Sequence, residues 1–208
     1  MKKLTVTAFA VAASLLVALP SAASASWKKA KSGGGVTVWT KEVPGKTLKD
    51  MKAETVITAK ITDIAHLLND ASAYKSWVAD LRTSRLIKRV SATENILYFV
   101  QKTPVIKDRD VVIRGRVTQN AASKVLTVNM QGIKGHVKES AKYVRLPKMN
   151  GKFVFTPIGG GKLKVVYTLS ADPGGKIPAS LANKFAVDTP FKTLKGLKQI
   201  SKNLAKYR

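Results

Sequence analysis

The 208-residue sequence contains no cysteine. This absence excludes disulfide bonds, thiol catalysis, metal sites built on cysteine and a lipoprotein anchor, which is attached to a cysteine. The folded domain must therefore be stabilised by its hydrophobic core. Hydrophobic residues make up 45% of the chain and charged residues 24%. These are the proportions of an ordinary globular protein rather than of a disordered one.

Histidine is also scarce, with His66 and His136 as the only two. Neither has a second histidine or a carboxylate cluster at the spacing of metal ligands, and no serine lies in a Gly-x-Ser-x-Gly motif. We therefore expect no metal and no other cofactor, and the sequence contains no catalytic constellation. An enzyme would need an acid or base with a perturbed pKa in its pocket. We expect the candidates Asp110 and Glu94 to lie at the periphery.

The first 25 residues have the pattern of a secretory signal peptide. Two lysines precede an apolar stretch over residues 4–19, and small residues at 23–25 fit a cleavage site before Ser26. The alternative is an uncleaved anchor, but the apolar stretch is shorter than the roughly 20 residues that span a bilayer. We expect a periplasmic or secreted protein whose single domain covers residues 26–208.

Positive charge dominates what the sequence does contain. The 37 lysines and arginines outnumber the 12 acidic residues, which gives a net charge of +25. Such a surface attracts polyanions. Because an exported protein rarely meets nucleic acid, we expect no nucleic-acid partner and favour the anionic headgroups of a membrane surface. A uniformly solvated basic surface is the alternative, and the sequence does not decide between the two.

Short stretches rich in β-branched residues alternate with turn residues after the expected cleavage site. Residues 27–32 are interpreted as a basic lead-in and the glycines at 33–35 as a flexible join. A first helix is expected after a cap at Thr62 or Asp63, ending near Ser72. Short turns between successive strands predict an antiparallel sheet in meander order. The strands are expected over residues 36–43, 51–59, 84–90, 95–102, 110–119, 124–132, 137–146, 151–157 and 163–171.

Alternation along these strands indicates a sheet with two different faces. Val111 and Ile113 lie on one face of their strand, whereas Arg114 and Arg116 lie on the other. Two further strands carry similar apolar stripes, formed by Leu126, Val128 and Met130 and by Leu163, Val165, Tyr167 and Leu169. The sheet therefore has one apolar face that another element must cover.

A long amphipathic helix from Pro178 onward is expected to supply that cover. Pro190 is expected to kink this helix or to restart it. Its apolar positions recur every three or four residues, at Leu181, Phe185, Phe191, Leu194, Leu197, Ile200, Leu204 and Tyr207. The opposite, outward face is basic and includes Lys192, Lys195, Lys198 and Lys202.

Three segments in this order resemble the START family of lipid-transfer domains, in particular its exported bacterial branch. They cover residues 74–77 (YKSW), 104–110 (PVIKDRD) and 169–178 (LSADPGGKIP) and together span most of the chain after residue 25. The resemblance implies an α+β, helix-grip fold in which a curved antiparallel sheet wraps around the long C-terminal helix. It also implies that one sterol, phospholipid or other hydrophobic molecule lies in a tunnel gated by that helix. We expect a monomer, although the sequence does not determine the oligomeric state.

Arg109 is the sharpest candidate for a ligand contact. It shares strand parity with Val111 and Ile113, so it is expected to point toward the apolar side. The family often pairs this arginine with an acid on the preceding strand, but residues 95–101 have no acid at their centre. Gln101 or Tyr98 could replace that acid as neutral partners, which leaves Arg109 freer to meet an anionic or carbonyl headgroup. The alternative is a structural salt bridge, with Asp108 or Asp110 or across the sheet.

The expected ligand-binding residues are Arg109, Trp77, Tyr98, Met130, Tyr167, Leu181, Phe185 and Phe191. Several of these, Trp77 above all, would serve equally well as ordinary core. The four outward lysines of the C-terminal helix are the expected contacts with a membrane surface. Two other functions remain open at this point. One is a helix-grip enzyme, such as a cyclase or hydrolase, acting on a hydrophobic substrate, and the other is a ligand-sensing adaptor.

Overall fold

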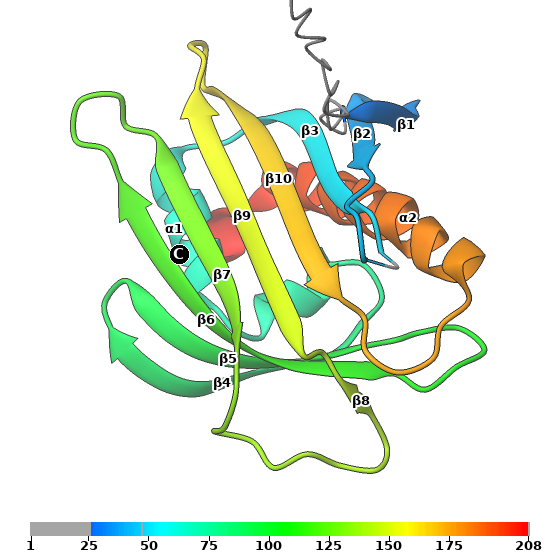
Figure 1. Ribbon diagram of the computed structural model, residues 1–208. Helices are drawn as coiled ribbons and strands as arrows, with labels where there is room; N and C mark the ends of the chain where they lie inside the picture. The colour runs from blue at the N-terminus through cyan, green and yellow to red at the C-terminus, as the bar shows by residue number, and fades with distance from the viewer. Residues whose placement is uncertain (1–25, 47, 208) are drawn as a thin grey trace, which may run out of the picture.

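The computed structural model describes residues 26–46 and 48–207, and Figure 1 shows their arrangement. The expected signal peptide over residues 1–25 lies outside the described residues. Within them, ten strands form one sheet and two α-helices pack against it. The strands are β1 (Lys28–Gly33), β2 (Val36–Lys41), β3 (Asp50–Thr58), β4 (Leu81–Ser91), β5 (Glu94–Gln101), β6 (Arg109–Gln119), β7 (Leu126–Ile133), β8 (Val144–Arg145), β9 (Lys148–Pro157) and β10 (Lys162–Asp172).

The sheet has the order β1-β2-β3-β10-β9-β7-β6-β5-β4, and its neighbouring strands are antiparallel. Strands β4 to β7 and β9 to β10 follow one another as the expected meander. Helix α1 (Ile61–Asn69) and a short 3-10 helix η1 (Ala73–Ser76) connect β3 to β4. Helix α2 (Ala179–Ile200) packs against β1, β2 and β3.

The curved sheet wraps around α2, which confirms the predicted helix-grip fold (Figure 1). Two short 3-10 helices, η2 (Ser201–Asn203) and η3 (Ala205–Tyr207), follow α2, and η3 contacts α1. The predicted alternation is confirmed on β6, where Val111 and Ile113 join the main core while Arg114 is exposed. The main core therefore lies on the concave side of the sheet.

Residues 28–33 form a strand and Gly34 and Gly35 form a tight turn, so the expectation of a basic lead-in followed by a flexible join was wrong. Strand β1 pairs with β2, and the chain turns at Gly34 and Gly35, whose φ angles are +60° and +76°. Two successive residues with positive φ make the tight turn that matches the twist of a hairpin. Because β1 is a largely exposed edge strand, its sequence shows no apolar alternation.

Two other local expectations were also wrong. Helix α1 begins at Ile61 after Lys60 and has no side-chain cap, so Thr62 and Asp63 lie inside the helix. Residues 137–146 contain only the two-residue strand β8, which pairs in parallel with β6. The surrounding segment is held instead by Arg145, which donates to the carboxylate of Asp110 at 2.9 and 2.8 Å.

A second, smaller apolar cluster lies apart from the main core and was not predicted. It is formed by Ile96, Tyr98 and Val100 of β5 and Val112 of β6, with partly buried residues such as Tyr143 packed against it. Strand β5 is therefore buried on both faces. This explains its continuous apolar run, because only strands covered on one side show alternation.

Candidate ligand-binding cavity

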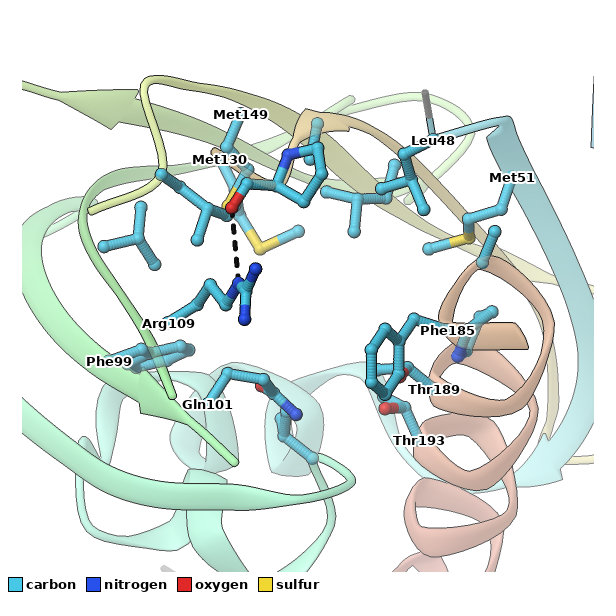
Figure 2. A pocket seen from close by; sticks show the side chains of 18 of the residues that line it. Leu48, Met51, Phe99, Gln101, Arg109, Met130, Met149, Phe185, Thr189 and Thr193 are labelled. Carbon is cyan, nitrogen blue, oxygen red and sulfur yellow. Dashed lines mark hydrogen bonds between the residues drawn. The ribbon is translucent and has the colours of Figure 1, made fainter. Parts of the chain in front are cut away.

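A cavity of about 180 Å³ lies between the concave face of the sheet and the middle of α2, from Phe185 to Thr193. The sheet contributes side chains from β3, β5, β6, β7, β9 and β10. Tyr74 of η1 and Trp77 and Val78, which follow η1, also line the cavity. Helix α2 contributes Phe185, Ala186, Thr189, Pro190 and Thr193. Figure 2 shows Phe185 and Thr189 facing Arg109 across the open space. The side chains around it are mostly apolar.

Aromatic rings form one wall of this cavity. Phe153 and Tyr167 stack with their centroids 4.0 Å apart, and Trp77 meets the edge of Phe153 at 5.7 Å. Tyr74 packs against Trp77 and Phe99, and its hydroxyl donates a hydrogen bond to the carbonyl of Leu68 at 2.8 Å. Burial raises the pKa of Tyr74 and of Tyr167. Both phenols therefore stay neutral, and this wall offers a ligand no negative charge.

Methionine supplies the adaptable part of the wall. Apart from Met1, the chain has three methionines, and all of them line the cavity (Figure 2): Met51, Met130 and Met149. Met130 fills space that Gly151 leaves open, since a Cβ atom at Gly151 would lie 2.7 Å from the Met130 methyl group. Unbranched methionine side chains fill irregular gaps and rearrange readily. The cavity can therefore change shape without backbone movement.

Arg109 brings the polar character into this apolar space. Its side chain is only 6% exposed and reaches from the start of β6 into the cavity (Figure 2). The guanidinium donates to three backbone carbonyls, those of Lys107 at 2.6 Å, Pro173 at 3.4 Å and Gly174 at 3.5 Å. Burial lowers the pKa of Arg109, and the nearby charge of Asp108 acts in the opposite direction. An arginine nevertheless stays charged in a protein.

No carboxylate forms an ion pair with Arg109 within residues 26–46 and 48–207, so the expected alternative of a structural salt bridge is not observed there. Asp108 instead pairs with Arg82 at 2.8 Å and accepts from the backbone N–H of Thr103 at 3.0 Å. Asp110 points to the opposite face of β6, where it pairs with Arg145. The hydrogen bonds of the Arg109 guanidinium in the described residues thus go to backbone carbonyls, and Asp108 acts on it as a nearby charge without pairing with it.

Of the two neutral partners expected for Arg109, only Gln101 lies beside it. Gln101 is directly opposite Arg109 in the β5–β6 register and lines the cavity, although its amide donates to the carbonyl of Ala79 at 2.5 Å. Tyr98 is on the other face of β5. Its hydroxyl donates to the carboxylate of Asp110 at 2.9 Å, so it cannot reach Arg109.

The structure brings together five of the eight expected ligand-binding residues. They are Arg109, Trp77, Met130, Tyr167 and Phe185, all in the cavity wall. The other three do not line this cavity. Tyr98 belongs to the second cluster and Leu181 is half-buried outside the wall. Phe191 packs toward β1, with the Lys31 ammonium 4.7 Å from its ring centroid.

The residues that the sequence analysis failed to predict in the cavity wall are mainly small or polar ones on α2. The face of α2 toward the cavity carries Ala186, Thr189, Pro190 and Thr193, because small residues let the helix approach the sheet closely. Their spacing of three to four residues repeats the helical period. That spacing was a signal for this face, but it was obscured by the larger apolar residues beside it.

The four lysines expected at a membrane surface all lie outside the cavity wall. Lys192 is near the carboxylate of Asp80 at 3.7 Å, and Lys195 lies over the ring of Phe191. Lys198 donates to the carbonyl of Val56 at 3.3 Å, whereas Lys202 is exposed. They remain candidate membrane contacts.

Residues 26–46 and 48–207 contain no group of three or more histidine, aspartate or glutamate side chains placed to hold a metal ion. In the same residues, neither α-helix combines the length and the apolar character that a membrane crossing requires.

Comparison with known proteins places the chain in a family. The START domain model matches residues 8–207. An uncharacterized protein of Pseudomonas aeruginosa is 30% identical over 188 residues, covering 90% of this chain and 93% of that protein.

Solved structures agree with this assignment. The STAR-related lipid transfer protein of Xanthomonas axonopodis is 29% identical, with a TM-score of 0.77 over 85% of this chain and 99% of that one. Human StAR-related lipid transfer protein 5 shares the fold, with a TM-score of 0.77 over 89% of this chain and 90% of that one, at 15% identity. With the family model matching nearly its whole length, the chain belongs to the START domain family.

Proposed function

We propose that this protein is a non-enzymatic carrier that binds one hydrophobic molecule beneath α2 and moves it between membranes. Membership of the START family supports binding of a hydrophobic ligand. The observation that carries the proposal is the apolar cavity itself, walled by aromatic and methionine side chains. Each methylene group that leaves water for such a wall gains about 0.8 kcal/mol. A single alkyl chain therefore gives enough binding energy for a carrier.

The helix that closes the cavity is the natural gate in this proposal. The segment between β10 and α2 contains Gly174 and Gly175, both with positive φ angles, and its Pro173 and Ile177 line the cavity. Pro190 lies within α2 and removes one backbone hydrogen bond next to the cavity. Movement of this segment and of the first half of α2 would open the cavity while the sheet remains intact.

Export to the periplasm or the exterior completes the proposal, on the basis of the signal-peptide pattern in residues 1–25. Cleavage removes Lys2 and Lys3 and lowers the net charge from +25 to +23 (25 − 2). This charge and the lysines on the outer face of α2 suit docking on anionic headgroups as a peripheral protein. Cleavage before Ser26 predicts that the protein isolated from the producing cell has Ser26 as its N-terminal residue. An intact mass that includes residues 1–25 would contradict this part of the proposal.

The titratable side chains of the cavity wall are relevant to the alternative that the protein is an enzyme. In the described part of the chain, no aspartate, glutamate or histidine lines the cavity. Its titratable side chains there are two lysines, one arginine and two tyrosines whose pKa values burial raises. A general base poised near neutral pH is the group that a cyclase or hydrolase needs. The observed set favours holding a ligand over transforming it.

A vesicle-to-vesicle transfer assay tests the proposed function. Donor vesicles would carry a pyrene-labelled alkyl chain, and its arrival in unlabelled acceptor vesicles would be followed by fluorescence. Thr189→Trp places a large ring in the cavity, whereas Lys184→Trp places the same ring on the exposed side of α2. We expect the first variant to lower the transfer rate at least about tenfold and the second to leave it unchanged. Equal rates with and without the wild-type protein would overturn the proposal.

A further inference from the structure

The cavity has a uniform sign of charge. Its described wall contains three charged side chains, Lys49, Lys102 and Arg109, and all three are cations. Lys49 is paired with Glu42 at 2.9 Å, but Glu42 is largely exposed and lies outside the wall. Lys102 is exposed to solvent, so Arg109 is the one of the three that is buried. A neutral ligand would leave this buried charge without a carboxylate or phosphate partner in a largely apolar space, where an unpaired charge is costly.

Arg109 also has donors left for a ligand. A guanidinium has five N–H groups in a planar fork. The three backbone carbonyls of Lys107, Pro173 and Gly174 take one N–H each from Nη1, Nε and Nη2, and two of these contacts are long, at 3.4 and 3.5 Å. One N–H remains on each terminal nitrogen. This pair matches the two oxygens of a carboxylate or phosphate group, which arginine binds in a bidentate manner.

Beyond Arg109, strand β6 contributes apolar side chains to the cavity wall. Val111 and Ile113 follow Arg109 on the same face of β6, at about 7 Å per two residues. A ligand head at Arg109 would therefore place its tail along this stripe. The cavity volume of about 180 Å³ is below the roughly 300–1,000 Å³ of sites for drug-sized ligands. It suits one narrow chain better than a lipid with two.

We propose that the ligand is an anionic amphiphile with a single alkyl chain, whose carboxylate or phosphate head group pairs with Arg109. This inference rests on the proposed function and deepens it by naming the class of molecule carried. The charge follows from the buried guanidinium of Arg109, which has no ion pair within the described residues, the head group from the two remaining N–H donors, and the single chain from the volume.

Calorimetric titration of the mature protein with three ten-carbon probes tests the inference. Decanoate and monodecyl phosphate carry the two candidate head groups, and 1-decanol has the same chain without a charge. We expect at least one of the two anions to bind tenfold to a hundredfold more tightly than decanol, as charge-assisted hydrogen bonds to a buried guanidinium predict. Which of the two binds more tightly identifies the head group.

Variants of Arg109 separate charge from packing. Arg109→Met keeps an unbranched apolar side chain and is expected to weaken binding of the preferred anion at least tenfold while leaving decanol binding within about twofold. Arg109→Lys keeps the charge but loses the fork, so its affinity for the anion should fall between the two. Arg89→Met removes one exposed arginine charge outside the cavity and is the matched control, with no change expected. Thermal melting of each variant, followed by circular dichroism, verifies that the fold is kept.

These measurements separate the identity of the head group from the carrier function. If the wild type binds decanol as tightly as both anions, or if Arg109→Met binds the anions normally, the inference about the head group is overturned while the carrier function stands. If the folded wild-type protein binds none of the three probes, the carrier function is overturned together with it.

Discussion

At the scale of single residues, the buried pair of Asp110 and Arg145 has a structural role on the face of β6 opposite the cavity. Asp110 is 1% exposed and accepts hydrogen bonds from Arg145 and from the hydroxyl of Tyr98. The hydrogen bond to Asp110 is the main cause that raises the pKa of Arg145, which stays charged. The pair fastens the segment before β9 over the second apolar cluster.

Removing one partner of this pair should therefore be costly. Arg145→Met leaves the Asp110 carboxylate buried without its cation and is expected to lower the free energy of unfolding by about 3–5 kcal/mol. Arg89→Met, on an exposed position of β4, is the control and should change it by less than about 0.5 kcal/mol. Urea unfolding followed by fluorescence measures both. If Arg145→Met lowered the free energy of unfolding by less than about 1 kcal/mol, the ion pair would not have the proposed structural role.

Because of its buried tyrosines, the protein should lose stability as the pH rises above 10. Burial and the hydrogen bond to Asp110 raise the pKa of Tyr98 from 10.0 to about 12, and burial raises the pKa of Tyr74 and Tyr167 as well. Above pH 10 the unfolded chain therefore releases phenolic protons that the folded protein retains. This contribution to stability is fully present below pH 10 and is lost as the pH rises toward the folded-state values.

Tyr98→Phe tests this dependence, because it removes one of the three phenols. We expect the free energy of unfolding to fall less steeply between about pH 10 and about pH 12 in the variant than in the wild type. The comparison uses the slope, since the lost hydrogen bond to Asp110 lowers stability at every pH. Identical slopes would mean that the phenol of Tyr98 ionises as readily in the folded protein as in the unfolded chain.

Residue positions could be predicted from the sequence where strand alternation is clean. Arg109 shares a face with Val111 and Ile113, and it lies in the cavity wall as that parity requires. Tyr98 was misplaced because β5 is buried on both faces, so an apolar run gives no sign of which side chain faces which way. That Arg109 has no carboxylate partner among the described residues depends on side-chain packing, which the sequence only suggested.

At the scale of elements, α2 approaches the chain after η1 closely at Gly196. A Cβ atom at Gly196 would lie 2.5 Å from the carbonyl oxygen of Trp77 and 3.0 Å from its Cα atom. Backbone atoms cannot move aside as a flexible side chain can. Gly196 therefore lets α2 rest directly on the backbone at Trp77, whose ring forms part of the cavity wall.

Gly196→Ala should consequently reverse the usual effect of this substitution in a helix. Alanine normally stabilises a helix by about 1 kcal/mol relative to glycine, but here overpacking should lower the free energy of unfolding by about 1–3 kcal/mol. Lys195→Ala, on the adjacent exposed position, should leave it nearly unchanged. Denaturant unfolding with fluorescence detection compares the two variants. A more stable Gly196→Ala protein would contradict the close packing.

Most elements could be predicted from periodicity, and the exceptions have physical causes. The meander from β4 onward and the long C-terminal helix follow from apolar alternation and helical spacing. Strand β1 was missed because an exposed, lysine-rich edge strand buries too little to show a pattern. The prediction of a strand over residues 137–146 was wrong because most of this segment is a loop. Its apolar residues cover the second cluster instead of joining the sheet.

At the scale of the whole molecule, the excess of positive charge is the feature most relevant to a membrane. A net charge of +25 on a chain of this size is screened within about 10 Å at 0.1 M salt. We expect the protein to co-sediment with vesicles that contain anionic phospholipid and to dissociate as the salt concentration rises. Binding that is indifferent to both salt and anionic lipid would reject electrostatic docking.

A variant with four substitutions tests which surface of the protein contacts the membrane. Replacing Lys192, Lys195, Lys198 and Lys202 by glutamine should weaken vesicle binding at least tenfold, since each lysine near an anionic surface contributes about 1 kcal/mol. Replacing Lys134, Lys138, Lys142 and Lys162, which are exposed elsewhere, changes the net charge equally and is the control. An equal loss for both variants would indicate that total charge, and not the outer face of α2, determines docking.

Occupancy of the space beneath α2 by one small molecule is the claim on which the other proposals depend, and native mass spectrometry tests it most directly. The protein would be purified from the compartment to which it is exported and sprayed without denaturant. We predict a single adduct per chain in the wild type, with the mass of an acidic, single-chain amphiphile after extraction, and its loss in Thr189→Trp but not in Lys184→Trp. A wild-type protein that carries no adduct, either as purified or after incubation with membrane lipid extract, would contradict the account.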